Sequence, residues 1–78
     1  MSVDELLQPI LNTTVSLKPS DNKETIPEWD SLAQINIVAA VEDLIGHELS
    51  TEEVLSLTSV ENVLRVCKAH GLELEIGK

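Results

Sequence analysis

The chain has 78 residues, of which 42% are hydrophobic, and its 14 acidic and 5 basic residues give a net charge of −9 at pH 7. This length allows one domain with a single core, and the hydrophobic fraction excludes a chain that is disordered throughout. A strongly acidic surface repels nucleic acid and anionic lipid, so we expect neither of them as a partner.

The rarer residue types narrow the class further. Cys67 is the single cysteine, which excludes an internal disulfide and fits a reducing compartment. No window approaches ~18 consecutive apolar residues, so no membrane span is expected. The chain begins with acidic residues where a secretory signal would carry Lys or Arg, so we expect a cytoplasmic protein.

A first helix is predicted over residues 3–15. Ser2 and Glu5 have the spacing of a capping box. Apolar residues follow at helical intervals, namely Leu6, Leu7, Ile10, Leu11 and Val15. Pro9 removes a hydrogen bond inside this helix, so we expect a kink or a late start.

Residues 16–30 are predicted to form a long loop. Two prolines and a Ser-Asp-Asn cluster disfavour regular structure. Loops of this length are uncommon in small domains unless they have a function. Ile26 and Trp29 are expected to pin the end of the loop to the helices, with Trp29 in a structural role.

Three more helices complete the predicted fold. The second spans residues 31–45 and ends at Gly46, the third spans residues 51–56 after a Ser50–Glu53 capping box, and the last spans residues 59–70. The tail 72–78 alternates like a strand but has no evident partner strand, so we expect it to be frayed or loosely packed. The prediction is a single all-α domain over residues 1–78, a small four-helix bundle with a short third helix.

The second helix has two apolar faces. One stripe is the predicted core face and consists of Ile37, Val38, Val41, Leu44 and Ile45. The opposite, narrower stripe contains Leu32, Ile35 and Ala39 and is accompanied by Asn36, Glu42 and Asp43. An apolar strip with a charged rim is typical of a protein-docking surface, although neighbouring helices or the loop could also cover it.

Charge is unevenly distributed along the chain. All five bases lie outside residues 24–64, and that segment contains nine acids: Glu24, Glu28, Asp30, Glu42, Asp43, Glu48, Glu52, Glu53 and Glu61. Such a segment attracts proteins with basic patches, although solubility alone would also explain it.

Ser31 at the start of the second helix has three interpretations. Ser31 or Asp30 could cap the helix. Ser31 could be a nucleophile, but the candidate base His47 follows the far end of the same helix, about 20 Å away, and His70 follows the last helix. The sequence also has no G-x-S-x-G motif, so catalysis is disfavoured. Ser31 could also be a site at which another enzyme attaches a phosphate-linked group, which the positive end of a helix dipole would stabilise.

The residues around Ser31 resemble a known family. The D-S-L sequence at 30–32, the segment V-A-A-V-E-D-L-I-G-H-E-L and the segment L-T-S-V-E-N-V-L are similar to acyl carrier proteins, in register from Trp29 to about Cys67. The resemblance implies that Ser31 carries 4′-phosphopantetheine, transferred from coenzyme A by a Mg²⁺-dependent phosphopantetheinyl transferase. It further implies a non-catalytic monomeric carrier that holds an acyl or aminoacyl thioester and presents it to partner enzymes.

The same resemblance implies which partners bind and where. These are the transferase, a ligase that loads the acyl or aminoacyl group, and a downstream acyltransferase or synthase with a basic docking surface. The implied contact residues are Asp30, Leu32, Ile35, Asn36, Ala39, Glu42 and Asp43.

Departures from the family pattern narrow the pathway. Fatty-acid carriers usually have Gly-Ala before D-S-L and an acid after it, whereas this chain has Glu28-Trp29 before and Ala33 after. The W-D-S-L form resembles free-standing carriers of specialised pathways, such as natural-product assembly or polysaccharide modification. Fatty-acid-type synthesis is the other pathway that the family resemblance allows. The alternative is a cofactor-free interaction scaffold of the same fold.

A metal site is not expected. Cys67 and His70 have the spacing of half a zinc site, but the chain has no second cysteine. Cys67 lies on the apolar side of the last helix, so we interpret it as a small core residue.

Overall fold

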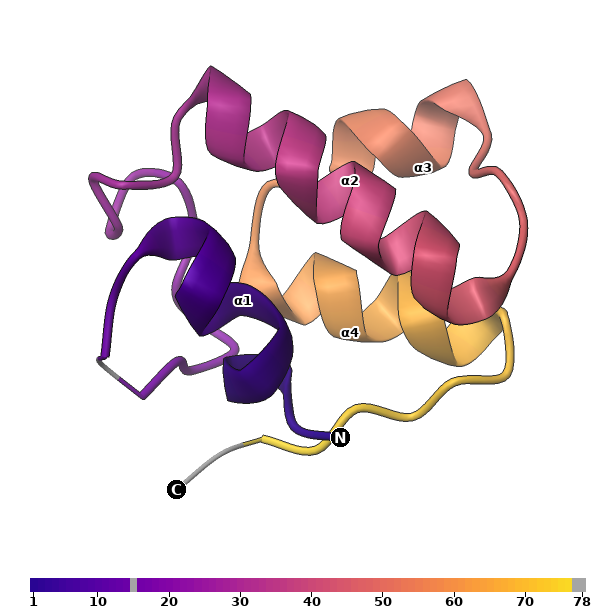
Figure 1. Ribbon diagram of the computed structural model, residues 1–78, viewed down its shortest axis with the longest axis horizontal. Coiled ribbons are helices and arrows are strands. Elements are labelled where there is room, and N and C mark those ends of the chain that lie inside the picture. Colours follow the sequence, from indigo (N-terminus) through magenta and orange to yellow (C-terminus); the bar gives the residue numbers. More distant parts are fainter. Residues whose placement is uncertain (15, 77–78) are drawn as a thin grey trace.

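The computed structural model describes residues 1–14 and 16–76. Four helices follow one another along the chain, α1 (Val3–Leu11), α2 (Ser31–Ile45), α3 (Thr51–Ser56) and α4 (Val60–Ala69), and the described ranges contain no strand beyond isolated bridges (Figure 1). The all-α fold class with a short third helix is therefore confirmed. The molecule measures 28 × 25 × 19 Å along its principal axes.

Helix α1 starts as predicted but ends earlier. Ser2 and Glu5 form a reciprocal capping box at its start, and the helix includes Pro9. It ends at Leu11 because Asn12 adopts the left-handed conformation (φ 56°, ψ 47°) and directs its N–H to the carbonyl of Gln8. Asparagine is one of the few side chains that tolerate this conformation. The predicted extension to residue 15 is thus wrong, and Val15 itself lies outside the described residues.

The long loop is held to the rest of the fold by buried side chains and backbone hydrogen bonds. Leu17, Ile26 and Trp29 are buried, and the last two have the pinning role expected of them. The loop also pairs with the start of α4, since the N–H of Val60 donates to the carbonyl of Asp21. The loop that leads into α2 is therefore held in place by buried side chains and by backbone hydrogen bonds.

Helix α2 presents one face to the core. Ala33, Ile37 and Val41 are buried, while Leu44 is 37% exposed. The prediction of Leu44 as a core residue is wrong because the core contacts of the last turn come from the partly buried Ile45. Gly46 ends the helix with φ 84°, a conformation that glycine adopts without steric cost.

Helices α3 and α4 begin with serine caps. Ser50 and Glu53 form the second capping box, and Ser59 caps α4. Helix α4 spans one residue less at each end than predicted, because Ser59 and His70 are its caps. Its buried face includes Cys67, which confirms that residue as part of the core.

The C-terminal tail pairs with the start of the chain. The N–H of Val3 donates to the carbonyl of Glu75 at 2.7 Å, and the N–H of Glu75 donates to the carbonyl of Met1 at 3.1 Å. These bonds form a parallel bridge, and Leu72 and Leu74 pack against the core. The expectation of a partnerless tail is wrong for residues 72–76, because the partner is a short segment before α1 with no strand pattern. Residues 77–78 lie outside the description.

Candidate functional site around Ser31

Ser31 is the first residue of α2 and its side chain is exposed. The cap of this helix is Asp30, whose Oδ1 accepts a hydrogen bond from the N–H of Ala33 at 2.9 Å. Within residues 1–14 and 16–76, the Ser31 hydroxyl has no hydrogen-bond partner. The capping interpretation therefore applies to Asp30 and leaves Ser31 available to a partner.

The turn before Ser31 is anchored by Trp29. Its indole is 4% exposed, and its Nε1–H donates to Oε1 of Gln34 at 2.8 Å. The amide of Gln34 also lies 3.4 Å from the carbonyl of Val54 in α3. One glutamine thus connects the turn before Ser31 to both α2 and α3.

A groove of about 470 Å³ opens beside Ser31, between the start of α2 and α3. Apolar side chains of Ile35, Val54 and Leu55 form part of its lining. Polar groups complete the lining, and these are Lys23, Asp30, Ser31, Gln34 and Thr58, with Trp29 beside them. This mixture suits a ligand that has both apolar and hydrogen-bonding parts.

The second apolar stripe of α2 is not covered by any part of the chain that the structure describes. Leu32 is 66% exposed and Ile35 is 64% exposed, and Leu55 of α3 extends the patch with 72% exposure. Asp30, Asn36, Ala39 and Asp43 are exposed around it. Glu42 is half-buried, and its Oε2 accepts the N–H of Leu49 at 3.0 Å, so part of its carboxylate already serves the α2–α3 loop.

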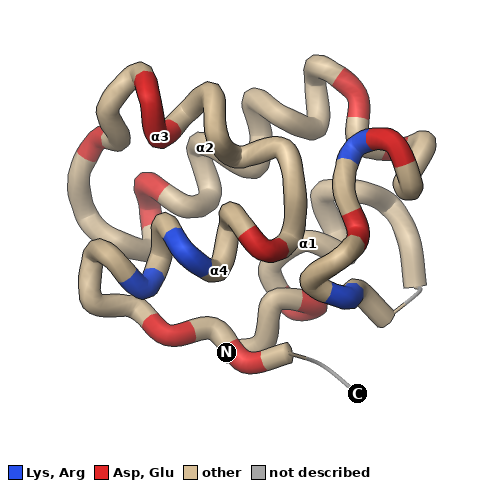
Figure 2. Tube along the Cα trace, turned by 180° about the vertical axis from the view of Figure 1, so that it is seen from behind, with Lys and Arg blue, Asp and Glu red and all other residues tan. Residues whose placement is uncertain are grey.

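Acidic and basic side chains are distributed unevenly among the helices. Helices α2 and α3 carry acids and no base, whereas α4 carries Arg65 and Lys68 (Figure 2). Arg65 pairs with Glu61 on its own helix at 3.1 Å. The surface around Ser31 is therefore apolar in its centre and mainly acidic at its edges, with Lys23 as a base in the lining of the groove.

Neither histidine hydrogen-bonds to Ser31. His70 Nε2 lies 2.7 Å from Oε2 of Glu53, and His70 Nδ1 lies 3.1 Å from Nε2 of His47. Hydrogen bonds from the Ser50 backbone and from His70 lower the pKa of Glu53 below its usual value. The two candidate bases are thus engaged with Glu53 and with each other, and no Ser–His pair is assembled.

Metal ligation finds no support either. Burial raises the pKa of the Cys67 thiol, which disfavours the thiolate that zinc requires. Among the residues that the structure describes, no group of three or more His, Cys, Asp or Glu side chains is arranged to hold a metal ion. The same ranges contain no helix that is both long and apolar enough to cross a bilayer.

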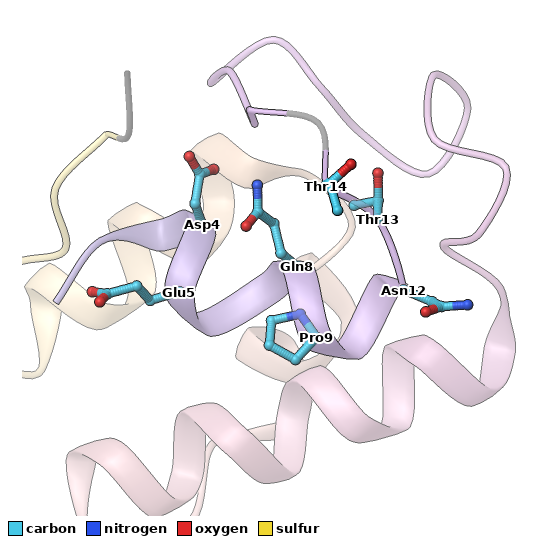
Figure 3. A pocket seen from close by; sticks show the side chains of 7 residues that line it. All are labelled: Asp4, Glu5, Gln8, Pro9, Asn12, Thr13 and Thr14. Atoms are coloured by element: carbon cyan, nitrogen blue, oxygen red, sulfur yellow. The ribbon is translucent and has the colours of Figure 1, made fainter.

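A second groove of about 360 Å³ lies along α1 and the residues after it (Figure 3). Its lining includes Asp4, Glu5, Gln8 and Asn12 and shares no residue with the groove beside Ser31. The carboxylate of Asp4 accepts the N–H of Leu17, and that of Glu5 accepts the N–H of Ser2. These acids hold the backbone, so we assign no chemistry to this groove.

Three features of the site were not predicted from the sequence. Gln34 has no pattern that would reveal its link to Trp29 and Val54. Leu55 belongs to a helix of six residues, too short for a periodicity to assign a face. The pairing of His47 with His70 joins residues 23 positions apart and depends on tertiary structure.

Comparison with known proteins supports the fold. No protein-family model matches the sequence, and no curated protein matches it. Among solved structures, a protein from Mycobacterium tuberculosis described as "a putative acyl carrier protein (Rv0033)" superposes with a TM-score of 0.71 and 19% sequence identity. The match covers 86% of this chain and 89% of the other. The chain therefore shares the fold of that protein.

Proposed function

We propose that the chain is an acyl carrier protein with 4′-phosphopantetheine attached to Ser31. The observation that carries this proposal is the exposed Ser31 hydroxyl, which has no partner within the described residues because Asp30 takes the capping role. The sequence resemblance around D-S-L and the shared fold support it.

The residues around Ser31 suit such a group. A phosphodiester on Ser31 would lie at the positive end of the α2 dipole. The adjacent groove offers both apolar side chains and hydrogen-bonding groups. When bound, the group supplies a thiol that holds an acyl or aminoacyl chain as a thioester. The protein itself exposes the attachment point and presents a docking surface, and it catalyses no step.

Attachment requires a partner enzyme. The Ser31 oxygen would bond to the phosphorus nearest the pantetheine, and the bond to the departing 3′,5′-ADP would break. The serine proton would pass to a base of the transferase, which also supplies the Mg²⁺ site. This division of labour agrees with a serine that has no histidine beside it.

Partner enzymes would dock on the exposed face of α2. Leu32, Ile35 and Ala39 would supply apolar contacts, with Asn36 beside them. Asp30, Asp43 and the free part of Glu42 would attract a basic surface, which speeds association through long-range attraction. A loading ligase and a downstream acyltransferase or synthase would use the same face. Natural-product assembly, polysaccharide modification and fatty-acid-type synthesis are the pathways proposed.

The experiment measures intact mass after incubation with coenzyme A, Mg²⁺ and a broad-specificity phosphopantetheinyl transferase. We expect one phosphopantetheinyl addition to the wild type and none to Ser31→Ala. Ser20→Ala removes another exposed serine and should be modified like the wild type.

The same experiment can reject the proposal. If several transferases modify neither the wild type nor Ser20→Ala, the chain is better explained as a cofactor-free scaffold that binds through Leu32, Ile35 and Ala39. Modification of Ser31→Ala would place the attachment point elsewhere.

A further inference from the structure

Two histidines and a glutamate connect three parts of the fold. His70 caps the end of α4, Glu53 belongs to α3, and His47 lies in the loop between α2 and α3. The rings of His47 and His70 meet edge to face with centroids 4.5 Å apart. His47 Nδ1 also lies 3.2 Å from the carbonyl oxygen of Glu48. Three hydrogen bonds therefore run in series from Glu53 through both rings to Glu48.

The number of protons in this series follows from its end groups. The Glu48 carbonyl can only accept, and so can the ionised carboxylate of Glu53. Each of the three hydrogen bonds then needs one ring N–H. Two neutral imidazoles provide two N–H groups, and two imidazolium rings provide four. One positive charge on the pair provides three.

Either neighbouring protonation state disrupts the series. With both rings neutral, one of the three bonds has no proton, and the bond to Glu53 loses the strength that charge gives it. With both rings charged, two N–H groups point at each other across the 3.1 Å between His47 Nε2 and His70 Nδ1. The singly charged pair alone completes all three hydrogen bonds of the series.

The charges around the pair also favour a cation. Besides Glu53, the elements that meet here carry more acids than bases. The bases are Arg65 and Lys68 of α4, and the acids are Glu42 and Asp43 of α2, Glu48 of the loop, Glu52 of α3, Glu61 of α4, and Glu73 and Glu75 of the tail. One oxygen of Glu42 is already used by the loop backbone. The side chains of His70 and Glu53 are 19% and 28% exposed, so their interaction is partly shielded from water.

We propose that His47 and His70 together carry one positive charge and, with Glu53, form a pH-dependent clamp that fastens α3 and the α2–α3 loop to the end of α4. Helix α3 supplies Val54 and Leu55 to the groove beside Ser31, so the clamp also controls one wall of that groove. This inference rests on the hydrogen-bond series alone and stands whether or not Ser31 is modified.

The test counts protonated ring nitrogens by ¹⁵N NMR of the full-length protein between about pH 5.5 and about pH 7.5. Two independent imidazoles with an ordinary pKa of about 6.5 would pass from nearly four protonated nitrogens to nearly two over this range. A pair that carries one positive charge predicts three protonated ring nitrogens across the whole pH range. A smooth fall from four to two would overturn the proposal.

Helix α3 provides a second readout. The methyl signals of Val54 and Leu55 should stay constant while three nitrogens are protonated and should shift at either end of that range. His70→Gln keeps a donor toward Glu53 but carries no charge, so these methyl signals should no longer respond to the pH. Methyl signals in the wild type that ignore the change in proton count would also overturn the clamp.

Two glutamate variants form a matched pair. Glu53→Gln removes the charge that the pair contacts, and glutamine is also able to complete the capping box. We expect the alkaline end of the three-proton range to move to lower pH. Glu52→Gln removes the same charge from an exposed neighbour and should leave that end unchanged. Equal shifts in both variants would contradict a specific role for Glu53.

Discussion

At the scale of single residues, the start of α2 divides two roles between adjacent side chains. Asp30 caps the helix through the N–H of Ala33, and Ser31 next to it is exposed without a partner within the described ranges. Trp29 before them is buried. Trp29 therefore anchors the turn, Asp30 caps α2, and Ser31 is left exposed.

Removing the cap should destabilise the fold. Asp30→Ala deletes the acceptor for the N–H of Ala33, and loss of such a cap costs about 1 kcal/mol of unfolding free energy. Urea unfolding followed through Trp29 fluorescence measures the change. Asp43→Ala is the control, because Asp43 is exposed near the negative end of the same helix and its removal should cost nothing. Equal losses in both variants would show that Asp30 has no capping role.

The raised pKa of Cys67 predicts that its thiol is alkylated slowly. Burial disfavours the thiolate, and the thiolate is the reactive form, so at pH 8 the native protein should react with iodoacetamide at least about tenfold more slowly than the unfolded chain. Mass spectrometry after timed alkylation measures this rate. Rapid alkylation of unmodified native protein would contradict the buried environment. After pantetheinylation, any fast thiol should belong to the added group.

At the scale of elements, α2 and α3 are joined by a side chain rather than by an extensive interface. Gln34 receives the indole N–H of Trp29 and reaches the backbone of Val54. The capping box on α3 and the contact of Glu53 with His70 hold the other side of this short helix. A helix of six residues has little stability by itself, so these contacts determine its position.

Truncating the glutamine should test that connection. Gln34→Ala leaves the buried indole N–H of Trp29 without its acceptor, which should lower the free energy of unfolding by about 1–3 kcal/mol. Trp29 is the single tryptophan, so its emission reports the change directly. Asn36→Ala, on the exposed side of the same helix, should change neither quantity. An unchanged emission in Gln34→Ala would mean that the indole bond contributes little.

At the scale of the whole molecule, the fold places one exposed apolar patch beside the exposed serine. Leu32 and Ile35 of α2 and Leu55 of α3 form this patch, and acidic residues lie around it. The bases Arg65 and Lys68 lie on a different helix, α4 (Figure 2). A partner enzyme that approaches Ser31 would therefore meet an apolar centre within a negative field.

Weakening this patch should reduce modification without affecting stability. Ile35→Ser should lower kcat/KM of the phosphopantetheinyl transferase about tenfold, as expected for a residue at the centre of an interface. Its free energy of unfolding should change by less than about 0.5 kcal/mol, because the side chain is exposed.

Ile76→Ser is the matched control, since Ile76 is an exposed apolar residue of the tail. It should leave kcat/KM unchanged. Added salt should lower kcat/KM for the wild type, because screening weakens the attraction of a basic partner. Equal rates for both variants would argue against docking on α2.

Local sequence determined most of the helix boundaries. Ser2, Ser50 and Gly46 define helix ends through interactions with their immediate neighbours, which is why the capping pattern predicted them. The exposed apolar stripe of Leu32 and Ile35 was also predictable, because α2 is long enough to show two faces.

Tertiary structure decided the features that depend on distant residues. The pairing of the tail with Met1 and Val3 and the exposure of Leu44 differ from the prediction, and both follow from long-range packing. The end of α1 also differs, but its cause is the local left-handed conformation of Asn12. The Trp29–Gln34–Val54 connection and the series through both histidines join elements that no local pattern relates. A sequence therefore specifies caps and amphipathic faces through short-range chemistry, whereas only the packed chain brings together side chains that are distant along it.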